Sequence, residues 1–179
     1  TIRAMERRRP SVEIFEQAGR LALKTDRLEG LVAYSNEYRR SGNSFGSIEE
    51  SLIHFRVALA AYKIRMGNWG QGLAIIPSPS QINSVIRDPL LKSKSFHILA
   101  LSSLVRGDSQ NARLMFQNMR DSAPQGSQQK ALARLLLSKI YYEQEQWAPI
   151  FEELMQVTKK STSWYPGVLV SAWAAYRVG

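Results

Sequence analysis

Hydrophobic and polar positions repeat at helical spacing along most of this 179-residue chain. Apolar residues recur three and four positions apart in two well-marked segments, 53–64 and 132–141, which places them on one face of an α-helix. No stretch alternates cleanly between apolar and polar residues, and Asn-Gly or Asp-Gly hairpin signals are absent. The pattern therefore predicts an all-α protein of about nine or ten helices.

Several helix ends can be predicted from local chemistry. Ser47 with Glu50 forms the pattern of a capping box. Gly107 can end one helix and Asp108 can cap the next. Pro124 then stops that second helix.

The segment Pro77-Ser78-Pro79 interrupts a helix, because proline inside a helix costs about 3 kcal/mol. We expect the helix before it to end near Ile76 and residues 80–88 to add a short helical turn. The segment is either a simple insertion or a loop that a partner recognises.

Helix–turn–helix segments recur along the chain. Their predicted turns fall at positions 25, 67, 107, 145 and 179, which are 42, 40, 38 and 34 residues apart. Small residues, glycine-containing turns and aromatic residues occupy matching places in successive copies. The clearest sets are Ala60, Gly67-Asn68-Trp69 and Gly72; Ala100, Gly107-Asp108, Ala112, Phe116 and Pro124; Ser138, Tyr141 and Trp147; and Ala172 with Gly179. Recurrence at a period of this length is typical of stacked repeats.

These residues resemble the tetratricopeptide repeat family, whose repeat folds as two antiparallel helices. The resemblance implies a right-handed α-α superhelix, a solenoid of stacked antiparallel hairpins. About four and a half hairpins would form a single domain over residues 11–179, after a basic segment at 1–10. Small residues would let paired helices approach closely. Phe116, Trp69 and Trp147 would fill the gap to the neighbouring hairpin.

In the resembled family, the first helix of each repeat lines a concave groove. Transfer of the groove positions to this sequence implies a mixed surface of apolar and basic side chains. Its predicted partner-binding residues are His54, Arg65, Lys94, His97, Leu101, Lys139 and Tyr142. Such a groove suits an amphipathic helix or an extended peptide that carries acidic residues.

The last predicted helix carries Val168, Leu169, Trp173, Ala174 and Tyr176, and no further helix follows it in the sequence. An uncovered apolar face marks an interface. Trp173, Tyr176 and Arg177 are therefore predicted to bind a partner. We expect the chain to be a fragment of a longer array; the alternative is that another chain covers the face. Self-association through residues 164–178 is a further hypothesis.

Charge adds a second interpretation. The chain has 24 basic and 15 acidic residues, for a net charge of +9, spread along the sequence apart from the run Arg7-Arg8-Arg9. A dispersed excess favours attraction to an acidic protein surface. The alternative function is nucleic-acid binding by a basic helical-repeat protein.

Recognisable catalytic chemistry is absent from the sequence. There is no cysteine, and the histidines, His54 and His97, lie 43 residues apart. The pairs Glu49-Glu50 and Glu152-Glu153 point about 100° apart on a helix, so we expect solvated faces. We expect no catalytic residue, metal or cofactor, and no membrane span. The prediction is a soluble, intracellular, non-catalytic scaffold or adaptor that binds proteins; the compartment itself is not determined.

Overall fold

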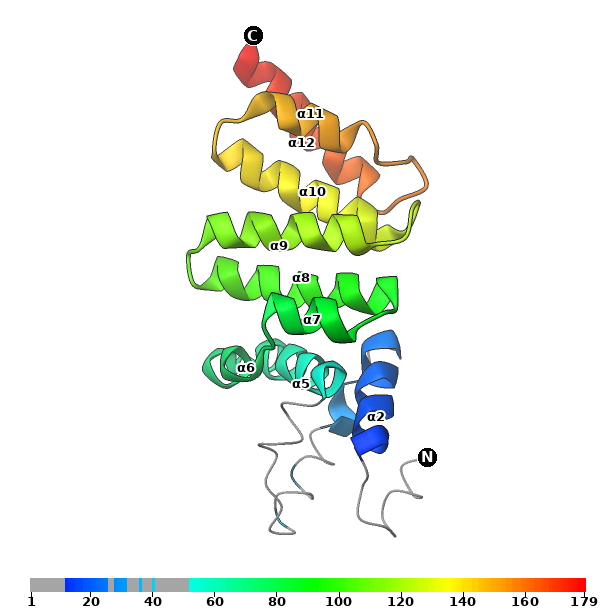
Figure 1. The fold of residues 1–179 in the computed structure, drawn as a ribbon. Coiled ribbons are helices and arrows are strands. Elements are labelled where there is room, and N and C mark those ends of the chain that lie inside the picture. Colours follow the sequence, from blue (N-terminus) through cyan, green and yellow to red (C-terminus); the bar gives the residue numbers. More distant parts are fainter. Residues whose placement is uncertain (1–11, 26–27, 32–35, 37–39, 41–51) are drawn as a thin grey trace. The chain divides into compact units, whose positions relative to one another are not determined.

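The computed structural model describes residues 12–25, 28–31, 36, 40 and 52–179 of the chain. Within these ranges it is all-α and contains no strand, and helices adjacent in sequence pack in pairs (Figure 1). The prediction of an all-α protein is thus confirmed. The basic segment 1–10, the capping box Ser47/Glu50, the pair Glu49-Glu50 and Asp26 of the first predicted turn lie outside the described residues.

The chain divides into two compact units, Thr1–Arg87 and Asp88–Gly179. The first contains four helices with defined bounds: α2 (Val12–Thr25), α5 (Ile53–Arg65), α6 (Trp69–Ile75) and α7 (Pro79–Val85). α5 packs against α2 and α6, and it is buried around most of its circumference. Gly19 of α2 lies directly against the backbone of Phe55, which leaves no room for a side chain.

The proline-containing segment behaves as its sequence predicts. α6 ends at Ile75 and Ile76 follows in extended conformation. The short helix α7 then begins with Pro79 in its first turn, and Ser78 caps it by accepting a hydrogen bond from the backbone N–H of Gln81. Proline fits there because the first turn of a helix has no partner for its N–H groups.

The second unit contains α8 (Pro89–Val105), α9 (Ser109–Ser122), α10 (Gln128–Glu143), α11 (Trp147–Leu154) and α12 (Trp164–Val178). α8 pairs with α9, and α10 pairs with α11 (Figure 1). Asp108 caps α9 through the N–H of Asn111 at 3.0 Å, as predicted, and α9 ends two residues before Pro124. The core of this unit contains Phe96, Phe116 and Met119, all fully buried.

Three turns repeat one backbone geometry. In each, a residue in the left-handed region is followed by a backbone N–H that donates to the carbonyl five residues back, which satisfies an otherwise free carbonyl at the helix end. The left-handed residues are Gly67 (φ 78°), Gly107 (φ 75°) and Glu145 (φ 56°). The hydrogen bonds run from Asn68 to Lys63 at 2.8 Å, from Asp108 to Ser103 at 2.9 Å and from Gln146 to Tyr141 at 2.9 Å. The predicted turn positions 67, 107 and 145 are confirmed.

The three aromatic residues predicted to fill gaps between hairpins have different environments. Phe116 is fully buried, and its ring contact is with His97 of its own hairpin. Trp147 is half-buried and packs edge-on against Tyr142, at 5.5 Å between ring centroids, across the turn of its own hairpin. Trp69 is 40% exposed, so its predicted packing role is wrong: it lies at the start of α6, beside the turn and facing solvent.

The turn geometry generates a stability prediction. Glu145 is the only non-glycine residue with positive φ among the described residues, and a side chain there costs about 1–2 kcal/mol. Glu145→Gly is expected to stabilise the protein by about 0.5–1 kcal/mol, after the greater flexibility of glycine in the unfolded chain is subtracted. Gly107→Ala is expected to destabilise it by about 1 kcal/mol. Urea unfolding followed by circular dichroism measures both. Gln144→Gly is the control, because Gln144 has φ −92° and gains nothing from glycine.

Candidate functional site

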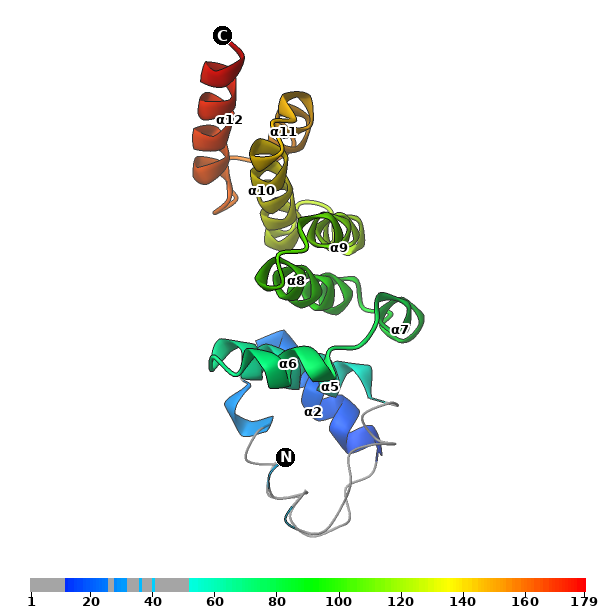
Figure 2. The ribbon, with the colours of Figure 1, turned by 90° about the vertical axis from the view of Figure 1, so that its left-hand side faces the viewer.

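α12 is the described helix with the most exposed large apolar side chains. Its inner side packs on α10 and α11, with Gly167 and Ala174 buried (Figure 2). A Cβ added at Gly167 would lie 3.1 Å from the Cδ2 of Leu154, so glycine allows α12 to approach α11 closely. α12 is thus anchored on one side, and the side chains on its other side are left exposed.

The exposed side of α12 concentrates large apolar side chains. Fourteen such residues are exposed among the described residues, and six of them belong to this one helix. They are Tyr165, Val168, Leu169, Trp173, Tyr176 and Val178. Scattered apolar residues are normal on protein surfaces, but a contiguous cluster marks an interaction site.

Two aromatic residues dominate this surface. Trp173 is 60% exposed and Tyr176 is 78% exposed, and their rings meet edge-to-face at 6.1 Å between centroids. With Leu169 and Ala172 they line a shallow open depression. Arg177 is the single charged side chain on α12. The surface therefore offers aromatic and aliphatic contacts beside one positive charge.

The predicted groove residues have varied environments. Arg65 and Lys139 are exposed, whereas Lys94 and Leu101 are half-buried. His97 and Tyr142 are half-buried against the second helix of their own hairpins: the His97 ring lies 6.3 Å from that of Phe116.

His54 is only 1% exposed, which differs from the open position that the resemblance implied. Its neighbours Ile53, Phe55, Val57 and Ala58 are buried as well, because α5 is enclosed on most sides. His54 therefore offers no surface to a partner. Of the predicted partner-binding residues, the structure brings Trp173 and Tyr176 together on one exposed surface.

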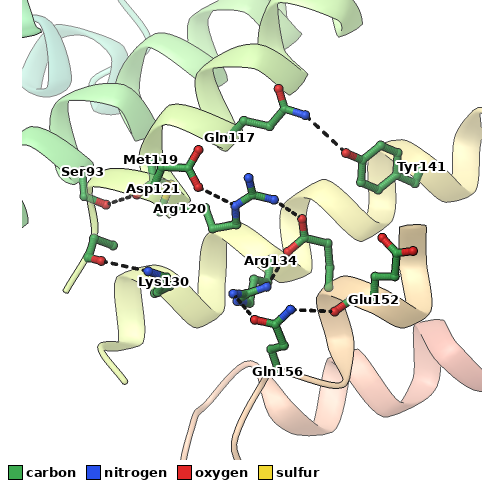
Figure 3. A network of polar contacts seen from close by, with 12 residues as sticks. Ser93, Gln117, Met119, Arg120, Asp121, Lys130, Arg134, Tyr141, Glu152 and Gln156 are labelled. Atoms are coloured by element: carbon green, nitrogen blue, oxygen red, sulfur yellow. Dashed lines mark hydrogen bonds and ion pairs between the residues drawn. The ribbon is translucent and has the colours of Figure 1, made fainter. Parts of the chain in front are cut away.

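A buried ion network ties the helices beneath α12 together (Figure 3). The carboxylate of Glu153 on α11 accepts hydrogen bonds from Arg134 of α10, at 2.7 Å, and from Arg120 of α9. Arg120 also pairs with Asp121, and Arg134 donates to Gln156 at 2.5 Å. Three helices thus meet at one carboxylate, which restricts how α11 sits on α9 and α10.

The predicted solvated face is confirmed for Glu152 and wrong for Glu153. Glu152 is exposed, but Glu153 is 6% exposed and Arg134 is 8% exposed. The sequence did contain a signal for the burial of Glu153. It lies three residues after Ile150 and directly before Leu154 on α11, and both of those apolar residues are buried.

The network also changes the acidity of one of its members. The pKa of Arg120 is raised, first by the hydrogen bond from its side chain to Asp121 and then by the nearby charge of Glu153. Partial burial opposes this by lowering the pKa. Arg120 therefore stays charged wherever the protein is folded.

Gln128, at the start of α10, holds the loop that leads into α12. Its Oε1 accepts hydrogen bonds from the backbone N–H of Thr162 at 3.2 Å and the Oγ of Ser161 at 3.0 Å. Its Nε2 donates to the carbonyl of Lys160 at 3.5 Å. Together with Gly167 against Leu154, this clamp fixes where α12 begins relative to α10 and α11.

No group of three or more histidine or acidic residues among the described residues is arranged to hold a metal ion. Within the same residues, no helix is both long and apolar enough to cross a membrane. Comparisons with protein-family models, with curated proteins and with solved structures found no match to this chain.

The ion network yields a second prediction. Glu153→Gln removes the charge that balances Arg134 inside the protein, and it is expected to destabilise the fold by about 3 kcal/mol, because a broken buried pair leaves an uncompensated charge. The double variant Arg134→Met with Glu153→Leu replaces ions by apolar groups and is expected to recover most of this loss. Thermal and urea unfolding of both variants check the prediction. A double variant no more stable than Glu153→Gln would contradict it.

Proposed function

We propose that this protein is a non-catalytic scaffold or adaptor that binds other proteins, and that the exposed apolar side of α12 is its main binding surface. In this proposal the helical pairs belong to a right-handed stack of tetratricopeptide-like hairpins. The three equivalent turns support a repeat, since each has a left-handed residue at the same place and the same backbone hydrogen bond after it.

The observation that carries the proposal is the cluster of exposed aromatic and aliphatic residues on α12. Tryptophan, tyrosine and arginine are the residues that most often dominate the energy of protein interfaces. Trp173, Tyr176 and Arg177 occur within five consecutive positions on a helix that is itself well anchored. A rigid aromatic surface binds with little loss of side-chain entropy.

The predicted groove residues form a second part of the proposal. Arg65 and Lys139 are exposed cations, and Lys94 and Leu101 are half-buried on α8. Within the second unit, Lys94 and Lys139 suit contact with an acidic peptide.

The binding role predicts a selective loss of partners. Trp173→Glu places a charge at the centre of the surface, and it is expected to weaken binding by about 30-fold or more, since truncation of a central interface residue costs about 2 kcal/mol or more. Affinity capture from cell extract with the wild-type chain and the variant, quantified by mass spectrometry, measures the difference. Leu114→Glu is the matched control, because Leu114 is 51% exposed on α9, outside the surface. Equal capture by all three chains would contradict the role of α12.

The charge of +9 supports one alternative, a helical-repeat protein that binds nucleic acid through its basic residues. Such binding would weaken steeply with salt, because each phosphate contact releases a counterion. Gel shift of single- and double-stranded RNA and DNA at about 50 mM and about 200 mM salt tests it. Absence of a shift at the lower salt would remove this alternative.

A further inference from the structure

The loop between α11 and α12, residues 155–163, is held by one side chain of another helix. The Oε1 of Gln128, at the start of α10, accepts hydrogen bonds from the Oγ of Ser161 at 3.0 Å and from both the Oγ1 and the backbone N–H of Thr162 at 3.2 Å. Its Nε2 donates a longer hydrogen bond, 3.5 Å, to the carbonyl of Lys160. We call this set of contacts the Gln128 clamp. Three of its four hydrogen bonds end on one oxygen, so an acceptor at position 128 is what the clamp requires.

The loop is also tied closely to the first turn of α12. The backbone N–H of Ser163 donates to the Oγ of Ser161 at 3.1 Å, and the N–H of Trp164 donates to the carbonyl of Ser161 at 3.1 Å. The ammonium group of Lys159 lies 5.9 Å from the centre of the Trp164 ring, which is within the range of a cation–π contact. A displacement of the loop therefore carries the first turn of α12 with it.

The side of α12 that faces α10 and α11 is held by small residues. Its buried members are Gly167 and Ala174, and neither has a side chain larger than a methyl group. By contrast, α8 buries eight residues, among them Leu91 and Phe96. Because hydrophobic stabilisation grows with the apolar area that is buried, this side of α12 gains little of it, and the polar clamp contributes a large share of the attachment.

We propose that Gln128 is a positioning residue for the exposed apolar side of α12. Gln128 lies on a different helix and acts through the loop, by holding the first turn of α12 against α10. When the clamp opens, the first turn of α12 is released and the helix no longer presents Trp173 and Tyr176 in one fixed orientation. The inference rests on the proposed function and adds to it the residue that controls the binding surface from outside.

Three side chains of similar length separate the acceptor from the other properties of position 128. Glutamine, methionine and glutamate have similar helix propensities, so exchanges among them change α10 itself very little. Methionine has no strong acceptor, whereas glutamate offers carboxylate oxygens to the same three donors. The proposal therefore predicts that Gln128→Met opens the clamp and that Gln128→Glu keeps it closed.

Limited proteolysis with trypsin measures the clamp without any partner. Trypsin cleaves after lysine, and the carbonyl that accepts from Gln128 belongs to the bond cleaved after Lys160. The protease has to take this carbonyl into its own oxyanion hole, so the cleavage rate follows the population of the open loop. Gln128→Met is expected to raise the rate of cleavage after Lys160 about fivefold or more, as the loss of one or two hydrogen bonds implies. Gln128→Glu is expected to be cleaved at the wild-type rate.

Hydrogen exchange tests whether α12 follows the loop. Amides of residues 164–174 are expected to exchange faster in Gln128→Met and to regain wild-type protection in Gln128→Glu, while exchange in α8 and α9 stays unchanged. Thermal unfolding checks that each variant keeps the fold. A role limited to the stability of the whole unit would instead raise exchange in all of its helices.

Two controls separate the acceptor from other effects. A carboxylate in the first turn of α10 also stabilises that helix through its dipole. The double variant Gln128→Met with Gln129→Glu has this carboxylate but no acceptor at position 128, and its loop is expected to stay open. Gln125→Met removes an exposed glutamine from the loop between α9 and α10, and it is expected to leave cleavage after Lys160 unchanged.

Affinity capture connects the clamp to binding. The proteins to be followed are those whose capture from cell extract is lost in Trp173→Glu. Gln128→Met is expected to capture about fivefold less of them, since their binding is weakened by the fraction of chains in which α12 is displaced. Gln128→Glu is expected to restore their capture.

Three results would overturn the inference. They are unchanged cleavage after Lys160 in Gln128→Met, faster cleavage with wild-type exchange and capture, and a loop that Gln128→Glu leaves as open as Gln128→Met does. The proposed function fails separately, when Trp173→Glu leaves the captured proteins unchanged. Cleavage and exchange need no partner, so they distinguish a failed clamp from a failed binding surface.

Discussion

Three helical hairpins, α5–α6, α8–α9 and α10–α11, depend on a short turn that places the second helix against the first in a fixed register. One residue enters the left-handed region and the following N–H closes a bond to the carbonyl five residues back, so the second helix always starts at the same place relative to the first. Small residues stand inside the hairpins: the carbonyl of Ala60 lies 3.1 Å from a Cβ added at Gly72, and Ala100 and Ala112 of the next hairpin are fully buried. The turn therefore sets where the second helix of each of these hairpins begins.

Equivalent positions of successive hairpins are occupied by residues of different chemistry. α8 and α9 bring apolar Phe96 and Met115 to the positions where α10 and α11 bring Arg134 and Glu153. A buried ion pair rarely adds much stability over an apolar pair of the same shape, but it tolerates no substitution of one partner alone. The network of Arg120, Arg134 and Glu153 thereby favours α11 as the partner of α10.

Helices, turns and several caps were predictable because their causes are local. Apolar spacing predicted α5 and α10, Gly107-Asp108 predicted a helix end and a cap, and the prolines near 78 predicted the break before α7. The environment of charged and polar side chains was not predictable in this way. Glu153 and Glu152 are adjacent and chemically identical, yet one is buried between two arginines and the other faces solvent. His54 was expected on an open groove and is enclosed by neighbours that pack on α5 from other parts of the chain.

The sequence alone determined the helical class, the turn positions and the exposed aromatic character of α12, because hydrophobic spacing, glycine and proline act over a few residues. Only the tertiary structure decided which side of each helix is covered. That choice depends on contacts between residues far apart in the chain, such as Arg134 with Glu153, Ser93 with Met119 and Gln128 with Thr162. Such contacts decide that one side of α12 is covered by α10 and α11 and that its other, apolar side stays exposed.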